Sequence, residues 1–142
     1  MERRVGAHLV QIEGDLLILT QHGDFTLDDM KTFTAIADAH GAPFGYLLTL
    51  VDLTDAGSLP ADARRYSADH VREAQRRGPI YAATALYGAG LVTRGMATLY
   101  FSAMRLLSAG GQTTHFAKTS EEARAHLAER RQYFRSQLKP AQ

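Results

Sequence analysis

The strongest constraint on the fold is the alternation of short apolar runs with longer segments of helical periodicity. FGYLLTLV at 44–51 is too short and too rich in leucine for an amphipathic helix, and IYAATALYG at 80–88 has the pattern of a central strand. Between them, PADARRYSADHVREAQRRG at 60–78 has the spacing of a polar helix with a thin apolar stripe. Strands that alternate with helices favour a sheet with parallel strands on which the helices pack.

The rest of the sequence continues this alternation. The further predicted elements are a β-hairpin, three helices and a short strand, at 8–20, 25–41, 91–111, 119–138 and 113–118. Thr26 and Thr119 precede acidic residues at the spacing of helix N-caps. The expected order is ββαβαβαβα, an α/β fold with a mixed, mainly parallel sheet and helices packed on it. We expect a single domain over 1–142, with 136–142 as a frayed tail.

Composition excludes several classes of protein. The sequence has no cysteine, so it has no disulfide, thiol nucleophile or thiolate metal ligand. The start of the chain has no apolar run long enough for a signal peptide, and glycines and arginines interrupt the longest apolar tract, Ile80–Leu107. We therefore expect a cytoplasmic protein without a membrane span.

The charges are distributed unevenly along the chain. Residues 1–59 contain three basic and nine acidic side chains, a net charge of −6, whereas residues 60–142 contain thirteen basic and six acidic ones, a net charge of +7. A basic second half is compatible with nucleic-acid binding. However, its arginines are scattered over helices that also carry acidic residues, so a nucleic-acid partner is not favoured.

Three stretches together resemble the STAS domain, the fold of anti-sigma-factor antagonists and of the cytoplasmic tails of sulfate transporters. LTLVDLTDAG at 48–57 resembles the Asp-Leu-Ser/Thr strand end of that family, and IYAATALYGAG at 80–90 occupies the place of its next strand. THFAKTSEEARAHL at 114–127 is similar to the closing strand and helix. The pattern is closest to the SpoIIAA-like branch, and it implies a bacterial regulatory or binding module rather than an enzyme.

One departure from the family concerns its regulatory serine. Antagonists carry a phosphorylatable serine at the start of the helix after this strand, but Leu59–Ala61 fills that place here. The nearest hydroxyls are Thr54 and Ser58. A phosphate there would lie beside a helix N-terminus, which suits a switch. A serine just before a helix-starting proline is also a common cap or turn residue, and this structural interpretation is favoured.

The turn after the strand at 80–88 is rich in glycine and invites comparison with nucleotide-binding loops. Gly88 and Gly90 begin a dinucleotide fingerprint, but Thr93 stands where its third glycine belongs. The same turn lacks the lysine of a P-loop, because Met96 takes that position. A turn that permits close strand–helix packing is the favoured interpretation, and an anion held by this turn with Arg94 is the alternative.

No catalytic or metal-binding set is assembled in the sequence. Asp52 and Asp55 lie at the end of a predicted parallel strand, where α/β domains bind ligands, and each is either a ligand acceptor or a turn cap. The six histidines fall on different elements without ligand spacing, and no nucleophile elbow is present. We therefore expect no catalytic residues, no metal and no cofactor.

The predicted helix around Met96–Leu107 is apolar on more than one face. Phe101 and Leu106 lie off its main stripe, which includes Met104. Ordinary burial, a homodimer interface and the lining of an apolar ligand pocket are the three possible explanations.

Three functions remain open. The first is a non-enzymatic STAS-like module that acts through a protein partner or a small ligand. The second is a carrier or enzyme-like domain with an apolar or anionic pocket at the strand ends, and the third is a homodimerising structural domain.

Overall fold

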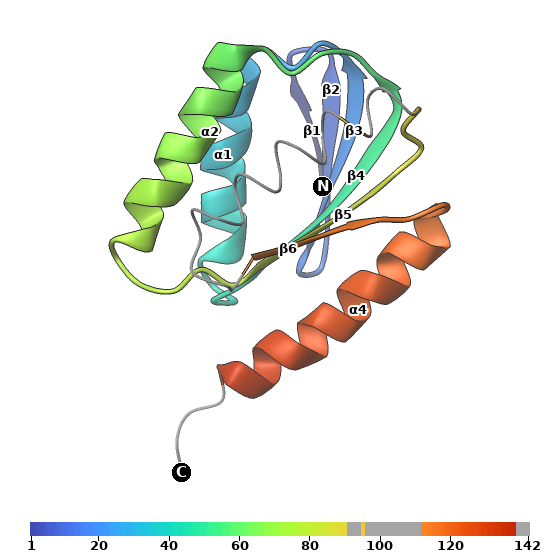
Figure 1. The fold of residues 1–142 in the computed structure, drawn as a ribbon. Coiled ribbons are helices and arrows are strands. Elements are labelled where there is room, and N and C mark those ends of the chain that lie inside the picture. Colours follow the sequence, from blue (N-terminus) through green and yellow to red (C-terminus); the bar gives the residue numbers. More distant parts are fainter. Residues whose placement is uncertain (91–94, 96–111, 139–142) are drawn as a thin grey trace.

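The computed structural model describes residues 1–90, 95 and 112–138 and forms one mixed β-sheet with helices on both faces (Figure 1). Its strands are β1 (Glu2–Val5), β2 (His8–Glu13), β3 (Leu16–Gly23), β4 (Leu47–Ala56), β5 (Ala82–Tyr87) and β6 (Gln112–Phe116). Its described helices are α1 (Leu27–Gly41), α2 (Ala61–Gln75) and α4 (Ser120–Gln137).

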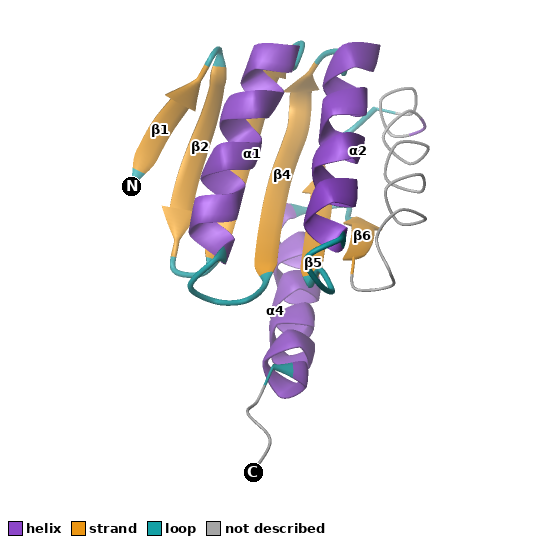
Figure 2. Ribbon diagram, turned by 90° about the vertical axis from the view of Figure 1, so that its left-hand side faces the viewer, coloured by secondary structure: helices purple, strands orange, loops and turns teal. Residues whose placement is uncertain are grey.

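The strands lie side by side in the order in which they occur in the sequence, from β1 at one edge to β6 at the other (Figure 2). β1, β2 and β3 pair antiparallel, whereas β3, β4, β5 and β6 pair parallel. The change from antiparallel to parallel occurs where a helix first connects two strands, because a parallel pair requires a long crossover. The predicted α/β class and the mixed, mainly parallel sheet are confirmed.

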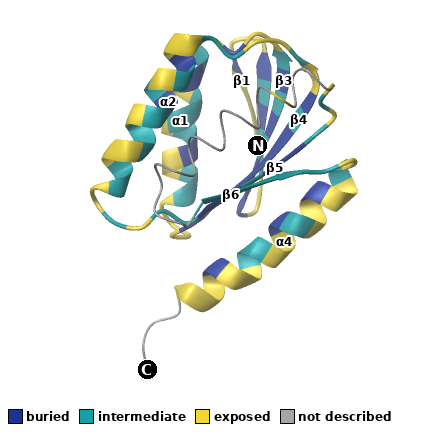
Figure 3. Cartoon of the chain, in the orientation of Figure 1, coloured by how far each residue is buried: buried dark blue, intermediate teal, exposed yellow. Residues whose placement is uncertain are grey.

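The sheet is buried on both faces in its centre. α1 and α2 cover one face and α4 the other (Figures 1 and 3). Alternate residues of β4 serve the two layers: Val51 and Leu53 pack with the α1–α2 side, and Leu48 and Leu50 with the α4 side. This two-sided burial explains why β4 has an almost continuous apolar sequence.

Side-chain caps fix the starts of two helices. Thr26 Oγ1 accepts the amide of Asp29, and the Asp29 carboxylate accepts the amide of Thr26, so both halves of a capping box are present at α1. Thr119 Oγ1 likewise accepts the amide of Glu122 at α4. The predicted caps at both threonines are confirmed.

Two strands differ from the sequence-based expectation. β1 was not predicted, because three of its four residues are exposed and charged and it carries no apolar pattern. β4 continues to Ala56, so Asp52, Thr54 and Asp55 belong to the strand and not to the following turn. β4 can extend this far because β3 still pairs with it at Asp55 and Ala56 after β5 has ended.

The last helix is longer than expected. α4 reaches Gln137, within the stretch 136–142 that was expected to be frayed.

A buried carboxylate ties the β2–β3 turn to α4. Asp15, with 7% of its surface exposed, accepts two hydrogen bonds from the Arg131 guanidinium at 2.6 and 2.7 Å and one from the Tyr46 hydroxyl at 2.6 Å. Burial alone would raise the pKa of Asp15, but the Arg131 and Tyr46 hydrogen bonds hold it below its usual value. The ionised carboxylate is thus the form that the fold requires.

We predict that Asp15→Asn lowers the free energy of unfolding by about 3 kcal/mol at neutral pH, because it leaves Arg131 without its charged partner. Since the pKa of Asp15 is lower in the folded state, its contribution is present above the unfolded-state pKa of about 3.9 and is lost as the pH falls through the folded-state value. Urea titrations between pH 7 and pH 2 should show this dependence in the wild type and a weaker one in Asp15→Asn.

The matched control is Glu13→Gln, which removes an ion pair with Arg124 whose side chains are 62% and 44% exposed. Its cost should stay below about 1 kcal/mol. Equal losses in the two variants would contradict the structural role assigned to Asp15.

Candidate functional site

Two of the residues singled out in the sequence, Asp52 and Thr54, meet Tyr87 at the carboxyl end of β4 and β5. The Asp52 carboxylate accepts the Thr54 amide at 2.9 Å and the Thr54 hydroxyl at 2.6 Å. Tyr87, which is opposite Asp52 in the register, also hydrogen-bonds to it. Burial and the Asp52 charge raise the pKa of Tyr87, so the phenol stays protonated at neutral pH. We call Asp52, Thr54 and Tyr87 the strand-end cluster.

Gly88 allows the strand-end cluster to close. Its φ of +82° lies in the left-handed region. A Cβ at this position would collide with Thr54 Oγ1 and approach Asp52 Oδ1 to 3.2 Å. This glycine therefore serves close packing between the turn and β4. The predicted packing of this turn against the following helix lies outside the described residues. Gly90, the other predicted glycine, has open space around the position of a Cβ.

Asp55 and Ser58 lie apart from this cluster. The Asp55 carboxylate is 3.1 Å from His22 Nδ1 in an exposed pair. Ser58 does not cap α2, because Pro60 occupies the N-cap position and its side chain forms no capping hydrogen bond. Instead the Ser58 amide donates to Asp24 Oδ1 at 2.7 Å. Ser58 is thus a turn residue that ties the β4–α2 connection to the β3–α1 connection.

Several predicted residues fall outside the described part of the chain, and their proposed roles stay predictions. They are the candidate anion ligand and the candidate dimer-interface residues, Arg94, Phe101, Met104 and Leu106.

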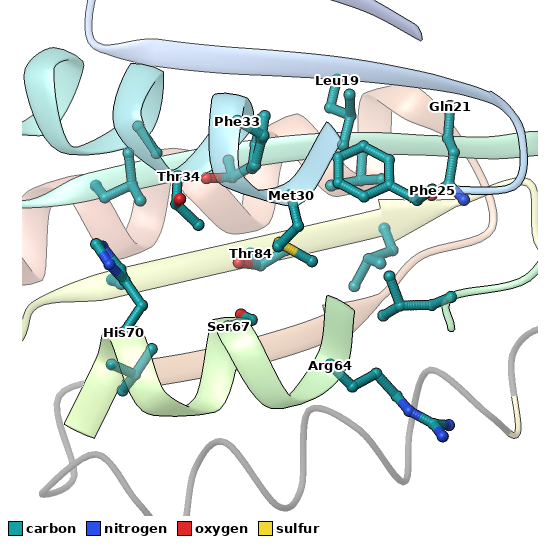
Figure 4. Close-up of a pocket in the computed structure, with 18 of the residues that line it drawn as sticks. Leu19, Gln21, Phe25, Met30, Phe33, Thr34, Arg64, Ser67, His70 and Thr84 are labelled. Atoms are coloured by element: carbon teal, nitrogen blue, oxygen red, sulfur yellow. The ribbon is translucent and has the colours of Figure 1, made fainter. Parts of the chain in front are cut away.

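A cavity of about 290 Å³ lies between α1, α2 and the sheet (Figure 4). Phe25, Met30 and Phe33 line it from the α1 side, and Val51 and Leu86 from the sheet. Its volume lies at the lower end of the roughly 300–1,000 Å³ typical of small-molecule sites, and its lining is mostly apolar, as in such sites.

Polar side chains line this cavity both from the sheet and from α2. Thr49 and Thr84 are register partners on β4 and β5, and both line the cavity floor. On the opposite side α2 contributes Ser67 and His70 (Figure 4). His70 Nε2 lies 2.9 Å from Asp38 Oδ2 and so joins α2 to α1. An apolar cavity with a few fixed polar groups can orient a small molecule.

The cavity and the strand-end cluster lie on opposite faces of the sheet. Asp52 and Thr54 alternate with Leu53, which packs on the α1–α2 side, while Tyr87 packs against the core beneath α4. The sequence-based pocket was expected between the Asp52–Ser58 turn, the Gly88–Gly95 turn and the apolar helix, and part of it lies outside the described residues. Of Asp52 and Ser58, only Ser58 lines the cavity. Sequence reasoning missed the cavity, because its lining comes from β3, β4, β5, α1 and α2 together. The one available signal was the small apolar stripe of α2.

The histidines have local partners. His8 is fully buried, and its Nδ1 accepts the His22 amide at 2.9 Å, so the proton lies on Nε2 and points to Asp29 at 3.1 Å. His115 and His126 stack with their ring centroids 4.3 Å apart. In the part of the chain that the structure describes, no three His, Asp or Glu side chains are grouped to hold a metal ion.

Comparison with known proteins gives a fold and no closer relationship. No protein-family model matches the sequence, and no curated protein matches it. An uncharacterised protein of the DUF3478 family with a SpoIIAA-like fold, from Shewanella loihica PV-4, superimposes with a TM-score of 0.56 at 17% identity over 85% of this chain and 92% of that one. The protein TM1081 superimposes with a TM-score of 0.55 at 14% identity over 84% and 86% of the two chains.

These likenesses define the class of protein. The chain has a SpoIIAA-like α/β fold, as the resemblance in its sequence implied. None of the helices described here is both long and apolar enough to cross a membrane.

We predict that Gly88→Ala destabilises the fold by about 2–3 kcal/mol, because alanine is strained at this φ and its Cβ meets Thr54. Gly14→Ala is the matched control: its φ is +62° and no atom lies within 4 Å of the new Cβ, so its cost should be about 1 kcal/mol. Chemical denaturation measures both. Thr54→Ala should recover part of the Gly88→Ala loss, and no recovery would rule out the contact as its cause.

Proposed function

We propose that this protein is a non-enzymatic binding module whose small-ligand site is the cavity between α1, α2 and the sheet. The observation that carries the proposal is the cavity itself, about 290 Å³ with a mostly apolar lining. A well-packed core leaves few voids larger than a water molecule, so a cavity of this size between two helices and a sheet is a feature to be explained. A bound apolar molecule would supply the contacts that the lining lacks.

The polar groups of the cavity support a ligand with a hydrogen-bonding group. Thr49 and Thr84 are register partners that line the cavity floor, and Ser67 lines the cavity from α2. Buried hydroxyls gain free energy when they are paired. A ligand that presents a polar group to this floor would be held in one orientation.

A second function, regulation through the β4–α2 turn, is supported by the position of Ser58. Ser58 is exposed, and both its backbone and its side chain hydrogen-bond to the Asp24 carboxylate. These hydrogen bonds lower the pKa of Asp24. A phosphate on Ser58 would add about −1.5 to −2 charges directly beside Asp24. The repulsion would open this turn at the end of the cavity, and a protein partner could read the change.

The binding function predicts that filling the cavity abolishes ligand uptake. Ser67 is buried and lines the cavity from α2, so Ser67→Phe should occupy its space. The uncharged fluorophore 1-aminoanthracene should brighten on binding the wild type and lose at least tenfold in affinity in Ser67→Phe. Arg65→Phe, at an exposed position of the same helix outside the lining, is the control and should bind normally. Equal affinity for all three proteins would disprove the cavity as the site.

The regulatory function predicts that a negative charge at position 58 loosens the turn. Ser58→Glu should lower the melting temperature by a few degrees more than Ser58→Ala, because glutamate repels Asp24 while alanine only loses a hydrogen bond. Adding Asp24→Asn should remove that difference. Mass spectrometry of the protein from its native host tests modification directly, and Ser58 and Thr54 unmodified under every growth condition would count against the switch.

A further inference from the structure

Arg64 is a cation of the cavity lining. It lies in the first turn of α2, is half-buried and contributes to the lining. Its guanidinium forms no ion pair or hydrogen bond with the residues that the structure describes. In Figure 4 the side chain extends away from Met30 and Thr84, so the charge lies at the rim and the apolar side chains lie inside.

Several other arginines on or beside the described helices pair with carboxylates, as is seen for Arg72, Arg76, Arg124 and Arg131. Arg65 forms no such pair among the described residues, but it is exposed and does not line the cavity. Arg64 is the arginine that lies at the entrance of the cavity, where its donor N–H groups have no acceptor among the residues that the structure describes.

The acidic groups nearest the cavity do not neutralise Arg64. The Asp24 carboxylate accepts hydrogen bonds from Ser58, and no ion pair joins it to Arg64. Asp38, the acidic residue of the lining, lies in the last part of α1 and contacts His70. The helix N-terminus at Ala61 adds partial positive charge on the same side as Arg64. Arg64 and the helix N-terminus thus favour an anion at this end, against the negative charges of Asp24 and of Asp62 in the same first turn.

We propose that the ligand of the cavity is an amphipathic carboxylic acid, with its carboxylate on the Arg64 guanidinium and its hydrocarbon part among Phe25, Met30 and Leu53. This inference rests on the proposed binding function and names the chemical class of its ligand. A planar carboxylate matches the guanidinium fork with two parallel hydrogen bonds. The charge stays at the half-exposed rim, so only the apolar part of the ligand leaves water.

The proposal is tested by competition of decanoate and 1-decanol against 1-aminoanthracene at pH 7.5, below the concentration at which decanoate forms micelles. The proteins are the wild type, Arg64→Gln and Arg65→Gln. Arg65 is the matched control, since it is the neighbouring exposed arginine on α2 and does not line the cavity. The quantity compared is the ratio of decanoate to decanol affinity, because the two ligands share a chain and differ in charge.

We expect Arg64→Gln to lose tenfold or more in decanoate affinity and to keep its decanol affinity, since a hydrogen bond to a charged group is lost only with the acid. Arg65→Gln should match the wild type with both ligands. Arg64→Lys, which keeps the charge but not the planar fork, should bind decanoate with intermediate affinity. Melting temperatures verify that each variant is folded.

Each of the following outcomes would overturn the proposal. An unchanged affinity ratio in Arg64→Gln, or equal losses in Arg64→Gln and Arg65→Gln, would show that Arg64 does not hold the acid while the cavity still binds. A loss of both ligands in Arg64→Gln alone would assign the arginine a structural role. If 1-aminoanthracene binds the wild type but neither ligand displaces it, the acid proposal fails while the cavity still binds. If the fluorophore does not bind the wild type, the binding function fails together with the acid.

Discussion

The arrangement of this protein depends on the burial of β4 from both sides. A strand whose odd and even residues are both apolar must be covered by two layers, and here α1 with α2 supply one layer and α4 the other. The α4 layer is closely packed, since Leu127 and Phe134 are almost completely buried there. Among the described residues, the α1–α2 layer leaves the cavity. The candidate binding site is therefore a consequence of unequal packing on the two faces of one sheet.

This division also separates the two places where the sequence suggested chemistry. The strand-end cluster lies on the α4 side, and its carboxylate is engaged by Thr54 and Tyr87. Ser58 and Arg64 lie on the other side and border the cavity. A change at Ser58 would thus act on the cavity and its entrance without passing through the strand-end cluster. Ligand binding and modification of the turn could influence each other through this shared border.

The sequence predicted the fold better than it predicted the site. The apolar runs of β4 and β5 and the caps at Thr26 and Thr119 are local signals, and local signals survive without knowledge of the tertiary structure. β1 was missed because Glu2–Arg4 are exposed, so its pairing with β2 leaves no apolar pattern. The contact between Asp52 and Tyr87 was partly predictable from the sequence, because both residues lie near the ends of neighbouring parallel strands. The cavity was not predictable from the sequence, because it depends on the distance at which α1 and α2 pack on the sheet.

The hydrogen bonds between Asp15 and Arg131 join residues 116 positions apart. They cannot form until nearly all of the described chain has left the ribosome, although the β2–β3 turn that carries Asp15 emerges among the first segments. Contacts of such long sequence separation form late, because the intervening chain must first lose its conformational freedom. The docking of α4 is accordingly expected to complete folding. A nascent chain that pauses before α4 would leave Leu48, Leu50 and Ala85 open to other partners.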